Sequence, residues 1–158
     1  QVLWDVGAGC GSVAIEWMRS HPRCMAVAIE KSKTRLKMIE QNAIQLGVPL
    51  LKIVPGTLPD VLEHLPLPDA IFVGGGIANS KRKGSSSLLD ICWKLLKPGG
   101  RLVAHAVTFE TEQQLLNWHK KHRGDLTRLS ISRADSIGKF QGWKPLRPVT
   151  QYSVTKEY

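Results

Sequence analysis

Three glycines near the N-terminus, Gly7, Gly9 and Gly11, lie between an apolar run and a helical pattern. Glycine takes a positive φ at low cost and lets a ligand approach the backbone. The amide groups at the start of the following helix carry a partial positive charge, which attracts a phosphate or a carboxylate. This arrangement predicts a turn that binds a nucleotide-like cofactor.

The spacing of the glycines favours one class of cofactor. Dinucleotide-binding turns follow Gly-x-Gly-x-x-Gly, whereas Gly11 comes one residue early and Ser12 stands where Gly or Ala is expected. Asp5 precedes the turn and suits a ligand with an ammonium group and a carboxylate at one end, which describes the methionine part of S-adenosylmethionine. Glu30, at the tip of the next apolar run, can accept hydrogen bonds from the ribose hydroxyls of either cofactor. We therefore expect S-adenosylmethionine.

The length and the cysteine content limit the class of protein. A chain of 158 residues is expected to form a single domain, spanning 1–158, with a core that needs no disulfides. The three cysteines are an odd number without Cys-x-x-Cys spacing, which argues against a disulfide framework and against a zinc site. With neither a signal-peptide layout nor an apolar stretch of about 20 residues, we expect a cytoplasmic domain without membrane contact. Because the chain begins within a strand, we also expect it to be excised from a longer two-domain protein.

The chain is strongly basic, with a formal net charge of +9. Such a charge favours an anionic partner, and either a nucleic acid or a small polycarboxylate would satisfy it. A basic surface that serves only solubility is the third interpretation.

Short apolar runs alternate with amphipathic stretches up to residue 123, as in a parallel sheet with crossover helices. The predicted strands are 2–6, 25–30, 51–54, 69–73 and 101–107, and the predicted helical stretches are 12–20, 32–46, 59–64, 86–96 and 110–123. Two later segments, Leu126 to Ser132 and Val149 to Val154, are expected to form an antiparallel hairpin that closes the sheet. We expect Trp143 and the segment 144–147 to interrupt this hairpin. This layout is that of class I S-adenosylmethionine-dependent methyltransferases, an α/β Rossmann-like fold.

The detailed motifs resemble a narrower family. The segments that carry the resemblance are Leu3-Trp4-Asp5-Val6-Gly7-Ala8-Gly9-Cys10-Gly11-Ser12-Val13, Pro68-Asp69-Ala70-Ile71-Phe72-Val73-Gly74-Gly75-Gly76, Ala104-His105-Ala106-Val107-Thr108-Phe109-Glu110-Thr111 and Pro148-Val149-Thr150-Gln151. Over nearly its whole length the chain resembles the C-terminal domain of the decarboxylating precorrin-6Y methyltransferases of corrin (cobalamin) biosynthesis. One departure is His105, where this family is expected to carry Asn.

The resemblance implies methylation of carbon 15 of a reduced tetrapyrrole, with loss of carbon dioxide from the acetate on carbon 12. An N-terminal methyltransferase domain, or a separate partner protein, would methylate carbon 5. The substrate would be an anionic precorrin, which agrees with the basic charge. Relatives suggest a homo-oligomer, as large as a tetramer, built partly through the C-terminal hairpin.

The turn, the strand tips and the resemblance together define the candidate site. The candidate cofactor-binding residues are Asp5, Gly7, Ala8, Gly9, Gly11, Ser12, Glu30, Lys31, Gly56, Thr57 and Gly74. The candidate substrate-binding residues, in the loops after the fourth and fifth strands, are Gly75, Gly76, Lys81, Arg82 and Thr108.

Two residues are candidates for catalysis. His105 could supply or take the proton that decarboxylation requires, although strand alternation could instead point it into the core. Glu110 opens a helix, where an acid either faces the substrate or only stabilises the helix dipole. His119 and His122 are three residues apart without a third ligand nearby, so we expect a solvated helix face and no metal.

Two alternative functions stay open at this stage. An RNA methyltransferase would explain the charge, but the basic segment 81–83 lacks the interleaved aromatic residues that stack on bases. A cofactor-binding domain without turnover is the other alternative, and the intact turn with Asp5 and Glu30 argues against it.

Overall fold

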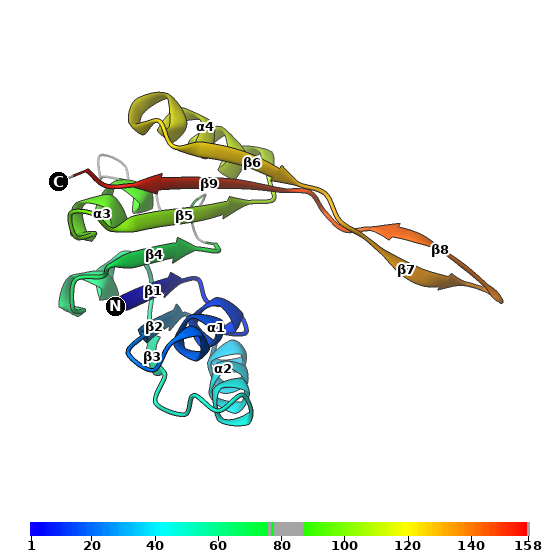
Figure 1. The fold of residues 1–158 in the computed structure, drawn as a ribbon, viewed down its shortest axis with the longest axis horizontal. Coiled ribbons are helices and arrows are strands. Elements are labelled where there is room, and N and C mark those ends of the chain that lie inside the picture. The colour runs from blue at the N-terminus through cyan, green and yellow to red at the C-terminus, as the bar shows by residue number, and fades with distance from the viewer. Residues whose placement is uncertain (76, 78–86, 158) are drawn as a thin grey trace.

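The computed structural model describes residues 1–75, 77 and 87–157, and Figure 1 shows a central sheet with helices on both faces. The strands are β1 (Val2–Val6), β2 (Met25–Glu30), β3 (Lys52–Pro55), β4 (Ala70–Val73), β5 (Arg101–Ala106), β6 (Asp125–Leu129), β7 (Ser132–Ile137), β8 (Phe140–Pro145) and β9 (Val149–Thr155). The helices are α1 (Ser12–Ser20), α2 (Lys33–Gln45), the 3-10 helix η1 (Asp60–His64), α3 (Leu88–Leu95) and α4 (Phe109–His122). None of the helices described is long and apolar enough to cross a membrane.

The main sheet has seven strands in the order β3-β2-β1-β4-β5-β9-β6. Strands β1 to β5 are parallel, while β9 runs antiparallel between β5 and β6. The strand order reverses between β1 and β4, and ligands of open α/β sheets bind at such a reversal, beyond the carboxyl ends of the strands. The fold therefore directs attention to the residues that follow β1, β2 and β4.

Two hydrophobic cores lie on opposite faces of the sheet. Helices α1 and α2 cover one face, where Ala14, Ile15 and Ile39 are buried against the small side chains of β2. Helices η1, α3 and α4 cover the other face, which contains Trp4 and Tyr152. Strand alternation divides the apolar residues of β1 between the two cores, which holds the turn after β1 in a fixed position.

The predicted parallel strands and crossover helices are confirmed with boundary shifts of a few residues. Ser32 caps α2, since its hydroxyl accepts from the amide of Arg35, as its position before the helix predicts. The segment predicted as helical at 59–64 is a 3-10 helix. The C-terminal hairpin is confirmed as the antiparallel pair of β6 and β9.

The expected interruption of the hairpin at Trp143 and 144–147 is correct only for its last two residues, since Leu146 and Arg147 lie outside the strands, between β8 and β9. Trp143 and Pro145 belong to β8, which pairs with β7 from Ser132–Pro145 to Ile137–Phe140. Figure 1 shows this pair as an arm that leaves the body of the molecule. We call β7 and β8 the arm below.

Candidate functional site

The carboxyl ends of four strands bring the predicted site residues together. Val6 pairs with Ile29 on one side and with Val73 on the other, so that Gly7, Glu30 and Gly74 come next on three adjacent strands. A cleft of about 410 Å³ lies at this edge. Its lining residues are Gly7, Ile29, Glu30, Lys31, Arg35, Gly56, Thr57, Leu58, Gly74 and Gly75.

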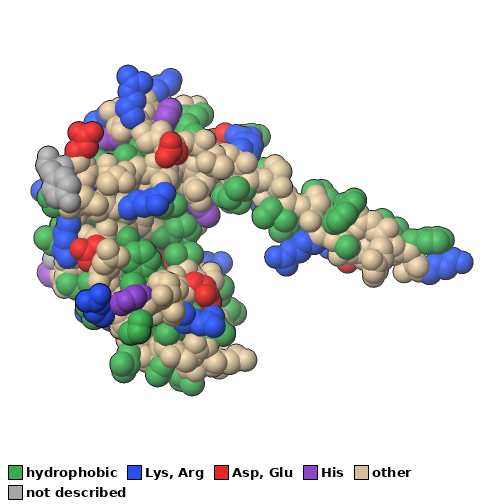
Figure 2. Space-filling view, in the orientation of Figure 1, with side chains coloured by type: hydrophobic (Ala, Val, Ile, Leu, Met, Phe, Trp, Pro, Cys, Tyr) green, Lys and Arg blue, Asp and Glu red, His purple; other side chains and the backbone are tan. Residues whose placement is uncertain are grey.

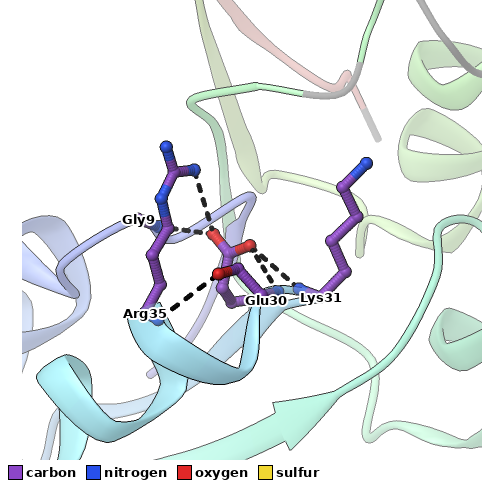
Figure 3. A network of polar contacts seen from close by, with 5 residues as sticks. Gly9, Glu30, Lys31 and Arg35 are labelled. Carbon is purple, nitrogen blue, oxygen red and sulfur yellow. Dashed lines mark hydrogen bonds and ion pairs between the residues drawn. The ribbon is translucent and has the colours of Figure 1, made fainter.

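Glu30 is the central polar group of the cleft, and its side chain is only 5% exposed (Figure 3). One carboxylate oxygen, Oε1, accepts from the amides of Lys31 and Ser32 at 2.9 and 3.0 Å. The other oxygen, Oε2, accepts from the amide of Gly9 at 3.0 Å and lies 3.7 Å from Nη1 of Arg35. Glu30 thus connects the glycine turn to the start of α2.

The amides of the glycine turn are mostly used within the protein. Those of Gly7 and Ala8 both donate to the carbonyl of Ile29 at 3.0 Å, and that of Gly11 donates to the carbonyl of Ala8. The amide of Gly9 donates to Oε2 of Glu30. The turn is therefore braced by its own hydrogen bonds, and amides free to meet an anion are expected in the first turn of α1.

Asp5 lies beneath this turn, at the end of β1, and is 1% exposed. Its Oδ2 accepts from the amide of Ala14 at 3.0 Å, in the first turn of α1. Burial raises the pKa of Asp5 to about 6, the Ala14 amide opposes that shift, and the charge of Glu30 adds to it. Asp5 is therefore a buried acid held against the helix start, and it does not line the cleft.

Two glycines of the turn are required by their surroundings. A Cβ on Gly7 would lie 3.1 to 3.3 Å from backbone atoms of Gly75, so the segments that follow β1 and β4 would have to move apart by a few tenths of an ångström to admit one. A Cβ on Gly11 would lie 2.9 Å from Cγ2 of Ile39, and its φ of +82° is a conformation that glycine favours. These glycines set the shape of the turn through packing against neighbouring elements.

The predicted cofactor residues therefore divide into two groups. Those that line the cleft are Gly7, Glu30, Lys31, Gly56, Thr57 and Gly74. Those that build or brace the turn behind it are Asp5, Ala8, Gly9, Gly11 and Ser12. Gly75, predicted for the substrate, also lines the cleft. The sequence reasoning missed Arg35 and Leu58, and a basic residue in the first helical turn after the strand-tip acid was the available signal for Arg35.

His105 faces a different hollow. It lines a depression of about 670 Å³ on the sheet face beside α1, together with Ser12, Phe72 and Gln151. Its Nε2 lies 2.9 Å from Oε1 of Gln151, and its ring meets Phe72 edge-on with 4.8 Å between centroids. His105 is thus half-buried, packed against an aromatic ring and paired with a neighbouring amide.

Thr108 and Glu110 are the two candidate residues at the start of α4. Thr108 is the N-cap of the helix, because its Oγ1 accepts from the amide of Thr111 at 3.3 Å. Glu110 is exposed in the first turn. Three predicted substrate residues, Gly76, Lys81 and Arg82, lie outside the described residues.

The expectation of a solvated face at His119 and His122 is wrong. His122 stacks on Trp118 with 4.1 Å between ring centroids, and burial lowers its pKa. Atoms Nδ1 of His119 and Nε2 of His122 are both buried. Within the described ranges, no group of three His, Cys, Asp or Glu side chains could hold a metal ion.

Comparisons with known proteins match this chain over almost its full length. The family model described as a precorrin methyltransferase domain matches residues 1–156. A precorrin-6Y C(5,15)-methyltransferase [decarboxylating] from Sinorhizobium is 46% identical over 156 residues, which cover 99% of this chain and 36% of that protein. A cobalt-precorrin-6B C(15)-methyltransferase (decarboxylating) from Salmonella typhimurium is 31% identical over 159 residues, which cover 98% of this chain and 79% of that protein.

A solved structure agrees with these matches. The crystal structure of the C-terminal domain of precorrin-6Y C5,15-methyltransferase from Rhodobacter capsulatus superimposes with a TM-score of 0.86 at 40% identity, covering 99% of this chain and 80% of that one. This chain thus spans about a third of the Sinorhizobium relative. The matches and the strand order confirm the predicted methyltransferase fold, and the chain belongs to the precorrin methyltransferase domain family.

Proposed function

We propose that this chain is an S-adenosylmethionine-dependent methyltransferase that methylates carbon 15 of precorrin-6Y and removes the carboxyl group of the acetate on carbon 12. The observation that carries the proposal is the pair of matches to differently named relatives. The chain covers only 36% of a C(5,15) enzyme but 79% of an enzyme named for carbon 15 alone. The part common to both is this domain, and the activity common to both names is the C15 step with decarboxylation.

The cleft carries its acid, Glu30, at the position where a ribose would bind. Glu30 is a buried carboxylate at the tip of β2, where an acid can accept from ribose hydroxyls. Gly56 and Thr57 follow β3 beside it and are proposed to hold the adenine edge. The first turn of α1, above buried Asp5, faces the methionine end. When bound, S-adenosylmethionine supplies a methyl group on a cationic sulfur.

The protein residues contribute by alignment and by exclusion of water. We propose that Gly75, Gly76, Lys81, Arg82 and Thr108 receive the substrate. An anionic tetrapyrrole is attracted by a chain of net charge +9. His105 and Glu110 are proposed as the groups to test for proton transfer.

Two further proposals concern assembly, one drawn from the relatives and one from the arm. Because the Sinorhizobium protein is much longer than this chain, we infer that an N-terminal methyltransferase domain or a partner protein performs the C5 step. We further propose a homo-oligomer formed through the arm, since β7 and β8 are described as pairing only with each other. A two-stranded hairpin is marginally stable alone. Ile137, Phe140 and Trp143 are 65%, 69% and 78% exposed, and Figure 2 shows hydrophobic side chains along the arm.

The test is mass spectrometry of precorrin-6Y incubated with this chain and S-adenosylmethionine. The proposal expects a product that has gained one methyl group and lost carbon dioxide. Glu30→Gln, which keeps the size of the side chain but weakens ribose binding, serves as the cofactor-site control and should give little product.

Two outcomes would argue against the proposal. Unchanged precorrin in the presence of demonstrable cofactor binding would contradict a complete C15 activity on this chain. Methyl transfer to RNA, with an affinity that falls steeply with salt, would replace the precorrin assignment. His105→Asn and Glu110→Gln are assayed in parallel for methylation and for decarboxylation. A variant that still methylates the substrate but no longer releases carbon dioxide assigns the proton transfer to the residue that it replaces.

A further inference from the structure

The surroundings of Glu30 raise a question about how a ribose could reach it. A carboxylate offers about four lone-pair sites. Oε1 already accepts two amide hydrogen bonds, from Lys31 and Ser32, and Oε2 accepts one, from Gly9. One acceptor site is therefore left, on Oε2, for two ribose hydroxyls.

Arg35 lies beside the oxygen that carries the remaining site. Its Nη1 is 3.7 Å from Oε2, which is an ion-pair distance but longer than a hydrogen bond (Figure 3). The side chain of Arg35 is 61% exposed, whereas that of Glu30 is 5% exposed. The guanidinium is thus the charged group beside Glu30 that can leave without disturbing the backbone, since the three hydrogen-bond donors to Glu30 are main-chain amides.

From this arrangement we infer that Arg35 is a displaceable counter-ion of the ribose acid, which competes with the cofactor for Glu30 and so weakens cofactor affinity. The inference rests on the proposed function, because it assumes that Glu30 binds a ribose. The backbone of Arg35 is fixed in the first turn of α2, where its amide donates to Ser32. The side chain moves and the helix does not.

Lys33 provides a matched control. It is an exposed lysine in the first turn of the same helix α2, and it is not among the residues that line the cleft. Its removal changes the net charge near the cleft by one unit but leaves in place the guanidinium that lies 3.7 Å from Oε2. A comparison of Arg35→Gln with Lys33→Gln therefore separates direct competition from a general charge effect.

The experiment is calorimetric titration of the chain with S-adenosylhomocysteine, whose net charge is zero, at low and at high salt. An exposed ion pair of this kind is weak, so Arg35→Gln is expected to bind roughly two- to fivefold tighter than the unsubstituted chain at low salt. The difference should shrink at high salt, which screens the pair. Lys33→Gln should bind like the unsubstituted chain.

Other results overturn the inference in distinguishable ways. Weaker binding by Arg35→Gln would show that the guanidinium contacts the ligand, and unchanged binding would show that it does not compete. An equal gain in both variants would reduce the effect to net charge. If Glu30→Gln binds as tightly as the unsubstituted chain, the cofactor site itself is misplaced and the proposed function fails with it.

Discussion

Asp5 is a residue whose burial is costly for the fold. Its pKa is about 6 in the folded chain against an ordinary value of 3.8, so the folded state holds its proton more tightly than the unfolded state. The resulting loss of folding free energy is absent below about pH 4, grows as the pH rises between the two pKa values, and is complete above pH 6. At its full size it is roughly 3 kcal/mol.

Asp5→Asn should therefore stabilise the chain at pH 7, by about 1 kcal/mol, because the unpaired amide group of Asn offsets part of the gain. Urea unfolding of both proteins from pH 4 to pH 7 measures the difference, which should widen with pH. The same substitution should weaken S-adenosylhomocysteine binding if the acid serves the cofactor. A constant difference between the two proteins across this range would show that the Asp5 carboxyl titrates normally.

Gly9 and Gly11 make a matched pair for testing the turn. Both have positive φ, at +61° and +82°, but a Cβ on Gly9 would meet nothing within 4 Å, whereas one on Gly11 would meet Ile39. Gly9→Ala should cost only the backbone penalty, roughly 1–2 kcal/mol. Gly11→Ala should cost more, by a further 1–3 kcal/mol or so from overpacking.

Unfolding free energies of the two variants decide this point. In a double-mutant cycle, Ile39→Ala, which removes the contacting atoms Cγ1 and Cγ2, should reduce the cost of Gly11→Ala and leave the cost of Gly9→Ala unchanged. Equal losses in the two glycine variants would contradict the packing role of Ile39.

At the scale of elements, the alternation of apolar runs and amphipathic stretches was sufficient to predict the parallel strands and their helices. The site at the strand ends was predictable too, because the carboxyl ends of parallel strands meet at one edge of the sheet. Gly7, Glu30 and Gly74 lie together at that edge. The arm was not predictable in this way, since every residue of β7 is exposed and no buried face leaves a periodic signal. The position of Arg35 after the strand-tip acid was visible in the sequence, but the direction of its side chain was not, because that direction depends on the placement of α2.

The C-terminal end of α3 contacts Lys156, which follows β9. Nζ of Lys156 donates to the carbonyls of Trp93, Lys94 and Leu96 at 2.8, 3.3 and 2.7 Å. These carbonyls have no partner within the helix, and a cation also interacts favourably with the helix dipole.

Lys156→Met should therefore destabilise the chain by about 1–3 kcal/mol, the range for hydrogen bonds to a charged donor. Thermal or urea unfolding measures this loss, and Lys37→Met, in the exposed part of α2, is the control for removal of a surface charge. If the two variants are equally stable, the C-terminal lysine is not a functional helix cap.

The arm is the feature that distinguishes the whole molecule from a plain sheet-and-helix domain. Because side chains of a strand alternate, Phe140 and Trp143 project from opposite faces of the β7–β8 ribbon. Both faces of the arm therefore expose a large aromatic side chain, and no described element of the same chain covers either. A second copy of the chain would bury both faces in a symmetric assembly.

If the proposed homo-oligomer forms through the arm, Trp143→Ser should dissociate it while leaving the fold of the body intact. Aromatic residues at the centre of an interface commonly contribute 2 kcal/mol or more, so the dissociation constant should rise by about 30-fold or more. Light scattering coupled to gel filtration gives the mass over a dilution series, and circular dichroism reports the fold. Gln141→Ser, on the same face of β8, is the control and should keep the unsubstituted mass, because a polar side chain on the arm contributes little to burial. A monomeric unsubstituted chain at every concentration would show that the arm packs on something other than a second copy.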